Sequence, residues 1–228
     1  MILIKYILSD IEGTTTSISF VVDTLFPYFL EQLPLWRQKM DQPEVKAQLE
    51  ATQALVLAEE NKNISLEQAF DYLEAWCKAD RKAGPLKALQ GIVWKAAYLN
   101  GQIQGHLYPE VADCLKTWKA KGLQLGIYSS GSVAAQKLLF GYSEAGDLTP
   151  LFSHYFDTKV GHKREAQSYQ NIQEAIGLPA NEILFLSDVP QELAAAQAAG
   201  LEVAHLLRPG TAPSKFKGYA NFNQIQID

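Results

Sequence analysis

Six polar side chains stand where apolar runs of this sequence give way to glycine, hydroxyl or charged residues. They are Asp10, Glu12, Ser129, Ser130, Lys163 and Asp188. A carboxylate can act as a covalent nucleophile, and carboxylate oxygens are ligands that suit Mg2+. Hydroxyl groups and an amine can hold an oxyanion. Together the six side chains supply what phosphoryl transfer needs: a nucleophile, a site for a cation and donors for the phosphate oxygens.

The order of these side chains along the chain suggests a role for most of them. Asp10 is the candidate nucleophile, and with Asp188 it could hold Mg2+, which usually takes one or two carboxylates. Glu12 is placed to protonate a leaving oxygen and then to activate water. Ser130 and Lys163 would hold the group that is transferred. A loop that passes through glycine and three threonines after Glu12 could surround an oxyanion with backbone N–H groups.

Alternation of apolar runs with helical patterns predicts the scaffold that positions these side chains. Strands that alternate with helices predict a doubly wound, Rossmann-like parallel α/β sheet. Ligands of such sheets bind beyond the carboxyl ends of the strands, which is where the six side chains stand. The expected strands cover 2–8, 123–128, 154–156, 183–186 and 203–207, and the expected helices between the later strands cover 133–140, 165–176 and 191–199.

Residues 17–104 break this alternation because they contain only helix-period segments. These segments cover 24–38, 44–61, 66–78 and 86–99. Ser65 and Gln68 have the spacing of a capping box at the start of the third segment. We therefore expect a helical cap domain, 17–104, inserted into an α/β core made of 1–16 and 105–228.

Composition excludes several classes of protein. The chain has 228 residues, of which 47% are hydrophobic and 20% are charged, so it can bury a core and is not intrinsically disordered. A formal net charge of -5 without a basic stripe argues against a nucleic-acid partner. The first apolar run is interrupted by Lys5, is too short for a membrane span and lacks the flanks of a signal peptide. Cys77 and Cys114 lack zinc-site or disulfide spacing, so we expect a cytoplasmic protein without a membrane partner.

Longer strings around the six side chains resemble the enolase-phosphatases of methionine salvage, a family within the haloacid dehalogenase superfamily. The strings are SDIEGTTTS at 9–17, YSSGSVAAQKLLFG at 128–141, FDTKVGHK at 156–163 and LFLSDV at 184–189. The resemblance runs over nearly the whole chain, and the four strings together are specific to the family. It implies a haloacid dehalogenase-like core with a cap, a monomer, and a small phosphate ester as substrate.

The resemblance also implies an activity and a set of site residues. The family depends on Mg2+, one per subunit; it enolises 2,3-diketo-5-methylthiopentyl-1-phosphate and then removes the phosphate to give an acireductone. Asp10 would be the nucleophile and Glu12 the second catalytic carboxylate, with its backbone carbonyl on the metal. The superfamily usually has Asp where Glu12 stands, so the reach of this group differs by one methylene. The substrate would be bound by Ser129, Ser130 and Lys163, and the metal by Asp10, Glu12 and Asp188.

Several assignments leave alternatives open. Lys159 competes with Lys163 for the phosphate, and the two serines could simply cap the following helix. Glu192 could be an outer-shell metal ligand. The base for enolisation is not identified; Glu12, a histidine or water could serve. Further candidates are His106 and His162 as proton carriers, Trp94 and Tyr98 as the lining of an apolar pocket or as core, and Arg208 as a surface or inter-element contact.

Three other functions use some of the same residues. A general sugar-phosphate phosphatase or a phosphomutase would need the same four strand ends, and a panel of phosphate esters would distinguish it. A haloacid dehalogenase needs no magnesium site, so Asp188 and Glu12 argue against it. A non-catalytic phospholigand-binding module has no need for a carboxylate that faces an anion, so Asp10 argues against that class.

Overall fold

A computed structural model describes residues 3–227 of the chain. The chain forms two compact units, one made of the residues up to Ile18 together with those from Gln104 onward, and one made of Ser19–Ile103. The boundaries expected from the sequence, at 17 and 104, lie within two residues of these divisions. That the second unit acts as a cap remains a prediction.

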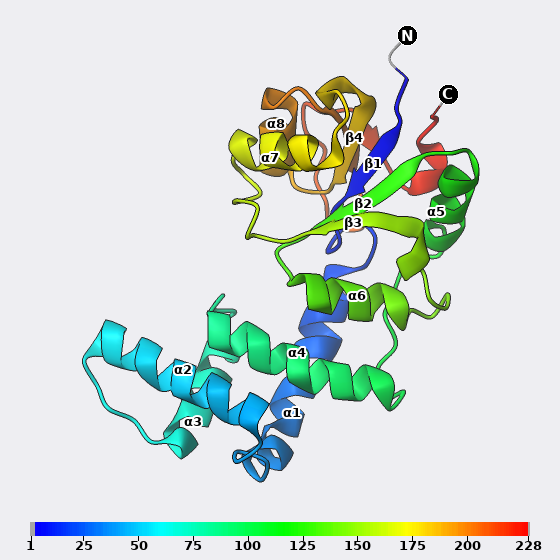
Figure 1. The fold of residues 1–228 in the computed structure, drawn as a ribbon. Coiled ribbons are helices and arrows are strands. Elements are labelled where there is room, and N and C mark those ends of the chain that lie inside the picture. The colour runs from blue at the N-terminus through cyan, green and yellow to red at the C-terminus, as the bar shows by residue number, and fades with distance from the viewer. Residues whose placement is uncertain (1–2, 228) are drawn as a thin grey trace. The chain divides into compact units, whose positions relative to one another are not determined.

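A parallel six-stranded sheet forms the centre of the first unit (Figure 1). Its strand order is β3-β2-β1-β4-β5-β6, so β1 lies between β2 and β4, where the direction of winding reverses. The strands are β1 Tyr6–Ser9, β2 Gln124–Tyr128, β3 Phe152–Phe156, β4 Ile183–Ser187, β5 Glu202–Leu206 and β6 Gly218–Tyr219. The doubly wound α/β fold predicted from the sequence is confirmed, and its switch point at β1 is the usual place for a ligand.

Helices cover both faces of this sheet. Buried side chains of β1 and β4 pack against α7 (Ala166–Ile176) and α8 (Pro190–Ala198) on one face. Helix α5 (Val111–Ala120) lies on the opposite side of the sheet (Figure 1), and α6 (Val133–Gly141) packs on β3. All four side chains of β1 are buried, as expected for a central parallel strand.

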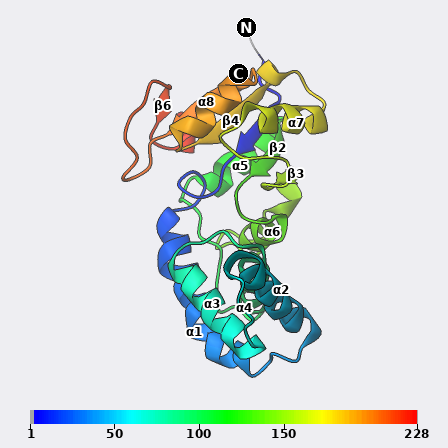
Figure 2. The same cartoon turned by 90° about the vertical axis from the view of Figure 1, so that its left-hand side faces the viewer.

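Two expectations about strands were wrong in detail. The first strand begins at Tyr6, although the apolar run begins at Ile2; Ile2 lies outside the described residues, and Lys5 still donates its backbone N–H to the carbonyl of Glu182. The tail after Pro209 was not expected to contain a strand, yet β6 pairs with β5 at the edge of the sheet (Figure 2). A two-residue strand is too short to give a period-2 pattern.

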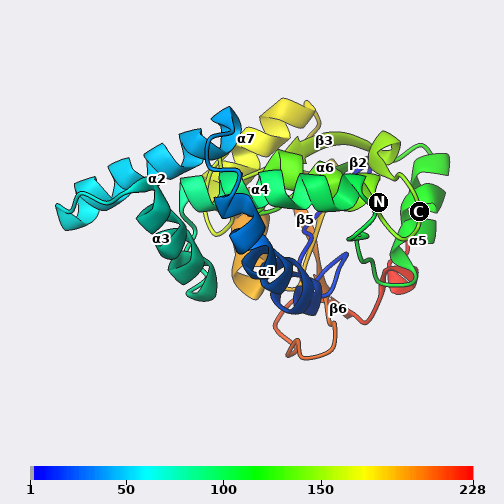
Figure 3. The same cartoon turned by 90° about the horizontal axis from the view of Figure 1, so that it is seen from below.

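The second unit is built from helices (Figure 3). A short π-helix, Phe20–Leu25, runs directly into α1 (Phe26–Arg37), followed by α2 (Pro43–Glu60), α3 (Leu66–Lys78) and α4 (Gly84–Leu99). The predicted capping box is confirmed, because Ser65 Oγ accepts a hydrogen bond from the N–H of Gln68, whose side chain in turn accepts one from the N–H of Ser65. The helices share their own apolar core. Within the described part of the chain, no helix is both long enough and apolar enough to cross a membrane.

Candidate active site

Asp10 stands at the carboxyl end of β1, in the middle of the sheet. Its backbone N–H donates to the carbonyl of Leu186 in β4 at 2.9 Å, and its Oδ1 accepts a hydrogen bond from the N–H of Ile11 at 2.7 Å. Only 2% of Asp10 is exposed. Because β1 has parallel neighbours on both sides, the segments that follow β2 and β4 lie next to this carboxylate.

Lys163 forms a buried ion-paired cluster with two carboxylates. Its Nζ lies 2.6 Å from Oδ1 of Asp10 and 2.7 Å from Oε2 of Glu192. Burial by itself would lower the pKa of a lysine, but the charges of Asp10 and Glu192 and their hydrogen bonds outweigh it and raise the pKa of Lys163. The amine therefore stays protonated at neutral pH. Lys159 is exposed, so of the two candidate lysines the fold brings only Lys163 to Asp10.

Two tyrosine hydroxyls hold the loop that carries Lys163. Tyr169 donates to the carbonyl of Lys163 at 2.7 Å, and Tyr128 donates to the carbonyl of Gly161 at 3.0 Å. Gly161 has φ +139°, and a Cβ there would lie 2.2 Å from Oγ of Ser168. Only glycine fits this position, which explains the glycine two residues before the lysine.

Asp188 follows β4 and is held by the loop that follows β1. Its backbone N–H donates to Oγ1 of Thr14 at 3.1 Å, and that hydroxyl in turn lies 3.4 Å from Oδ1 of Asp188. Gly13, with φ +73°, passes so close that a Cβ would lie 2.2 Å from Oδ2 of Asp188. Burial and the charge of Asp10 raise the pKa of Asp188 to about 6. The charge of Asp10 therefore disfavours ionisation of Asp188.

We expect Gly13→Ala to lower magnesium affinity and activity by about 10-fold or more, because the new methyl group displaces the Asp188 carboxylate. The matched control is Gly122→Ala. Gly122 also has a positive φ, of +90°, but open space for a methyl group. Both variants should lose roughly 1–2 kcal/mol of stability to backbone strain. Magnesium titration of the two variants would show the difference; an equal loss of affinity in both would contradict the predicted role of Asp188.

Glu12 and Ser129 face each other across the ends of β1 and β2. Oγ of Ser129 donates to Oε2 of Glu12 at 3.3 Å and accepts from the N–H of Gly131. Burial and the charge of Asp10 raise the pKa of Glu12. Ser129 is buried and Ser130 is exposed. The side chain that caps α6 is that of Ser132, not of either predicted serine.

The donor set suits magnesium. Among the described residues, no three side chains of His, Cys, Asp or Glu converge as a metal-binding group. Mg2+ does not require such a cage, because it usually takes one or two carboxylates and completes its shell with water and substrate oxygens. Asp10 and Asp188 provide two carboxylates whose mutual repulsion a cation would relieve. The backbone carbonyl of Glu12, on the loop that follows Asp10, is the third ligand that the family resemblance implies.

The stability of the metal-free protein should fall as pH rises through the range in which Asp188 titrates. The folded-state pKa of Asp188, about 6, lies above the 3.8 of a free aspartate side chain. The folded protein therefore binds more protons than the unfolded chain between about pH 4 and 6, so this group's contribution to the free energy of unfolding decreases as pH rises. Thermal melts in the presence of chelator should show that stability decreases less between pH 4.5 and 7 in Asp188→Asn than in the wild-type protein. Replacing the chelator with Mg2+ should restore the stability that the wild-type protein loses at pH 7. An identical pH dependence in both proteins would contradict the raised pKa.

Other predicted side chains lie in different surroundings. Nδ1 of His106 lies 2.8 Å from Oγ1 of Thr16, close to the loop after β1. His162 is exposed, and its Nδ1 accepts from the N–H of Arg164. Tyr98 is buried in α4, while Trp94 stacks on Phe26 within the second unit. Of these groups, it is His106 that contacts the loop that follows Asp10.

Three further groups around the site were not among the six predicted site residues. Glu192, for which the sequence left an outer-shell metal role open, pairs with Lys163 and accepts from Oγ of Ser187 at 3.1 Å. Thr14 holds Asp188, and the ring of His205 lies 3.0 Å from the carbonyl of Asp188. Thr14 lies within the family-specific string at 9–17, so the sequence could have indicated its role. Nothing local in the sequence marks His205.

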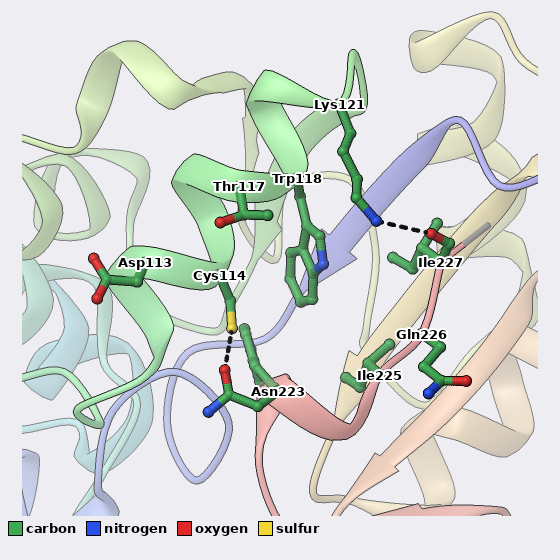
Figure 4. Close-up of a pocket in the computed structure, with 10 residues that line it drawn as sticks. Asp113, Cys114, Thr117, Trp118, Lys121, Asn223, Ile225, Gln226 and Ile227 are labelled. Atoms are coloured by element: carbon green, nitrogen blue, oxygen red, sulfur yellow. Dashed lines mark hydrogen bonds between the residues drawn. The ribbon is translucent and has the colours of Figure 1, made fainter.

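A separate cavity of about 530 Å³ lies between α5 and the C-terminal segment 222–227 (Figure 4). Trp118 and Cys114 of α5 line one side of it, and Cys114 Sγ lies 3.2 Å from Oδ1 of Asn223. None of the six predicted site residues lines this cavity. The candidate active site is therefore the cluster at the strand ends.

Comparison with known proteins agrees with this arrangement. A family model described as haloacid dehalogenase-like hydrolase matches residues 4–200. An enolase-phosphatase E1 of Pseudomonas aeruginosa (strain UCBPP-PA14) is 53% identical over 227 residues, which cover 99% of both chains. The chain belongs to the enolase-phosphatase E1 family of haloacid dehalogenase-like hydrolases.

Other relatives extend this family assignment. The enolase-phosphatase E1 of Picosynechococcus sp. is 52% identical over 212 residues, 93% of each chain. The crystal structure of the UTR4 protein of Saccharomyces cerevisiae superposes with a TM-score of 0.82 at 38% identity, covering 97% of this chain and 100% of that one. Enolase-phosphatase E1 relatives thus match the chain over both of its units, and the haloacid dehalogenase-like family model spans the four strand ends at which the predicted site residues stand.

Proposed function

We propose that this protein is a bifunctional enolase-phosphatase of methionine salvage. It enolises 2,3-diketo-5-methylthiopentyl-1-phosphate and then hydrolyses the phosphate ester, giving the acireductone 1,2-dihydroxy-3-keto-5-methylthiopentene. The observation that carries this proposal is the buried cluster of Asp10, Lys163 and Glu192 at the switch point of the sheet. The family assignment selects the substrate.

Asp10 is the proposed nucleophile of the phosphatase step. Lys163 and the N–H of Ile11 both contact its Oδ1, so Oδ2 is the oxygen that attacks phosphorus. The bond from phosphorus to the ester oxygen breaks, and Glu12 gives that oxygen its proton. Glu12, now ionised, takes a proton from water, whose oxygen attacks phosphorus and releases phosphate and free Asp10. Ser129, Ser130 and Lys163 bind the phosphate during both transfers.

The carboxylates of Asp10 and Asp188 and the carbonyl of Glu12 would hold one Mg2+. The ion would offset the repulsion between an anionic nucleophile and an anionic phosphate and would acidify the C–H next to the diketone. For the enolase step, Glu12 is the proposed proton carrier because its raised pKa makes its carboxylate a stronger base than that of an exposed glutamate and because its carboxyl group contacts Ser129 at the end of β2. His106, close to the same loop, is the alternative.

The remaining parts of the proposal concern the protein as a whole. We propose that residues 17–104 form the cap that sets substrate choice, as a specificity element joined to a shared catalytic core. We also propose a cytoplasmic monomer that acts on a small phosphate ester. Sedimentation at several protein concentrations would test the monomer.

A paired assay tests the function. Enol absorbance and phosphate release are followed together on the diketone phosphate with Mg2+, beside a panel of sugar phosphates. Transient enol followed by phosphate is expected from the diketone, with little turnover of the panel. Turnover of several sugar phosphates without action on the diketone would keep the catalytic site and move the function to a general phosphatase.

Glu12→Gln should slow phosphate release by roughly 10²- to 10⁴-fold, because glutamine cannot carry the proton. Enol formation should slow as well. Glutamine preserves the size of the side chain and its contact with Ser129. The matched control, Glu174→Gln on the exposed side of α7, should leave both rates unchanged. An unchanged enolase rate in Glu12→Gln would confine Glu12 to the phosphatase step and make His106 the next base to replace.

A further inference from the structure

Arg208 is a buried arginine that reaches the loop after β1 from the far end of the chain. Only 5% of it is exposed. Its Nε and Nη2 both donate to the backbone carbonyl of Thr14, at 3.1 Å and 2.8 Å. Of the two alternatives left by the sequence, a surface or an inter-element contact, the structure shows the second: the buried guanidinium contacts the loop that follows Asp10 and holds Asp188.

The guanidinium is itself fixed from several directions. Its Nη1 forms an ion pair with Oε1 of Glu110 at 2.7 Å, and the same oxygen accepts from the N–H of Phe222 at 3.3 Å. The guanidinium carbon lies 3.9 Å from the ring centroid of Tyr108. A planar, permanently charged group with fork geometry suits such a site better than a lysine does.

Thr14 connects this arginine to Asp188. The carbonyl of Thr14 is held by Arg208, while its hydroxyl accepts from the N–H of Asp188 and lies 3.4 Å from Oδ1. Gly13, the preceding residue, lies against the same carboxylate. A shift of Thr14 therefore moves the groups that set the orientation of the Asp188 carboxylate.

We propose that Arg208 is a positioning residue for the metal site: with Glu110, it fixes Thr14 so that Asp188 presents its carboxylate to Mg2+. This inference rests on the proposed function, in which Asp188 binds the metal. In this proposal Arg208 acts on the metal site through Thr14, to whose carbonyl it donates, and not by direct contact with the ion. Outer-shell partners of metal ligands commonly change affinity when replaced, because a ligand that must be reoriented binds less well.

Calorimetric titration of the purified protein with MgCl2, without substrate, tests the inference. Arg208→Lys keeps a positive charge for Glu110 but loses the two-pronged contact with Thr14, and it should raise the Kd for Mg2+ about 10-fold. Thr14→Val removes the hydroxyl while it preserves the shape of the side chain, and it should raise the Kd similarly without disturbing Arg208. The second variant decides the matter if Arg208→Lys does not fold.

The control is Leu148→Ala, a buried apolar position whose backbone hydrogen bonds are to Phe140 and Leu151 and not to a site residue. It should lower Tm and leave the Kd for Mg2+ at the wild-type value. Wild-type affinity in Arg208→Lys or, where that variant does not fold, in Thr14→Val would reduce Arg208 to a structural support and overturn the inference. Failure of the wild-type protein to bind Mg2+ would instead overturn the proposed metal site itself, and the inference with it.

Discussion

We expect Asp10→Asn to abolish phosphate release, lowering its rate by about 10⁵-fold or more, as in other enzymes that lose their covalent nucleophile. Asparagine has the same shape and can still accept from the N–H of Ile11. It cannot form a stable acyl phosphate, and it removes one of the two carboxylates that hold Lys163. The measurement is phosphate release from the diketone phosphate at saturating Mg2+, with enol absorbance followed in the same cuvette.

The control for this variant is Asp113→Asn, an exposed aspartate of α5 that should leave the rate unchanged. Hydroxylamine added during turnover should capture the acyl phosphate of wild-type protein as a hydroxamate at position 10, and should capture nothing from Asp10→Asn. If Asp10→Asn released phosphate at a rate within about 10-fold of the wild-type rate, Asp10 would not be the nucleophile of a covalent mechanism.

The sequence was informative wherever function depends on residues that follow a strand. Asp10, Lys163 and Asp188 each stand after an apolar run, and the parallel sheet brings the ends of those runs together. Periodicity also predicted α1–α4 and α6–α8 to within a few residues, because each has an apolar side that must be buried, whereas α5 was not predicted.

Contacts between distant loops could not be predicted in the same way. Arg208 and Thr14 are separated by 194 positions, and neither lies in a repeating pattern. The same limit applies to Glu192: its position four residues after Asp188 left an outer-shell metal role open, but its pairing with Lys163 could not be predicted. Such pairings depend on where loops end in space, and local sequence does not encode that. They are also the contacts that hold the reactive side chains in place.

Lys163→Met should cost both activity and stability. Methionine nearly matches the length of lysine but leaves the buried carboxylates of Asp10 and Glu192 without their cation. Breaking a buried ion pair from one side typically costs about 3–5 kcal/mol, and loss of the phosphate-binding amine should slow phosphate release by roughly 10³-fold. Denaturant unfolding and the phosphate assay measure the two effects separately.

The loss of stability should depend on pH with a defined sign. The pKa of Glu192 is raised to about 7 by burial and Asp10, and Lys163 lowers it, so removal of the lysine raises it further. Folded Lys163→Met then binds more protons than its unfolded chain up to above pH 7, and its free energy of unfolding decreases as pH rises through that range. Adding Glu192→Gln should recover part of the stability at pH 7.5 and none of the activity, while Lys159→Met, on the exposed rival lysine, should change neither. If the double variant were no more stable than Lys163→Met, repulsion between the buried carboxylates would not be the cause of the lost stability. A loss of activity in Lys159→Met would instead assign phosphate binding to the exposed lysine.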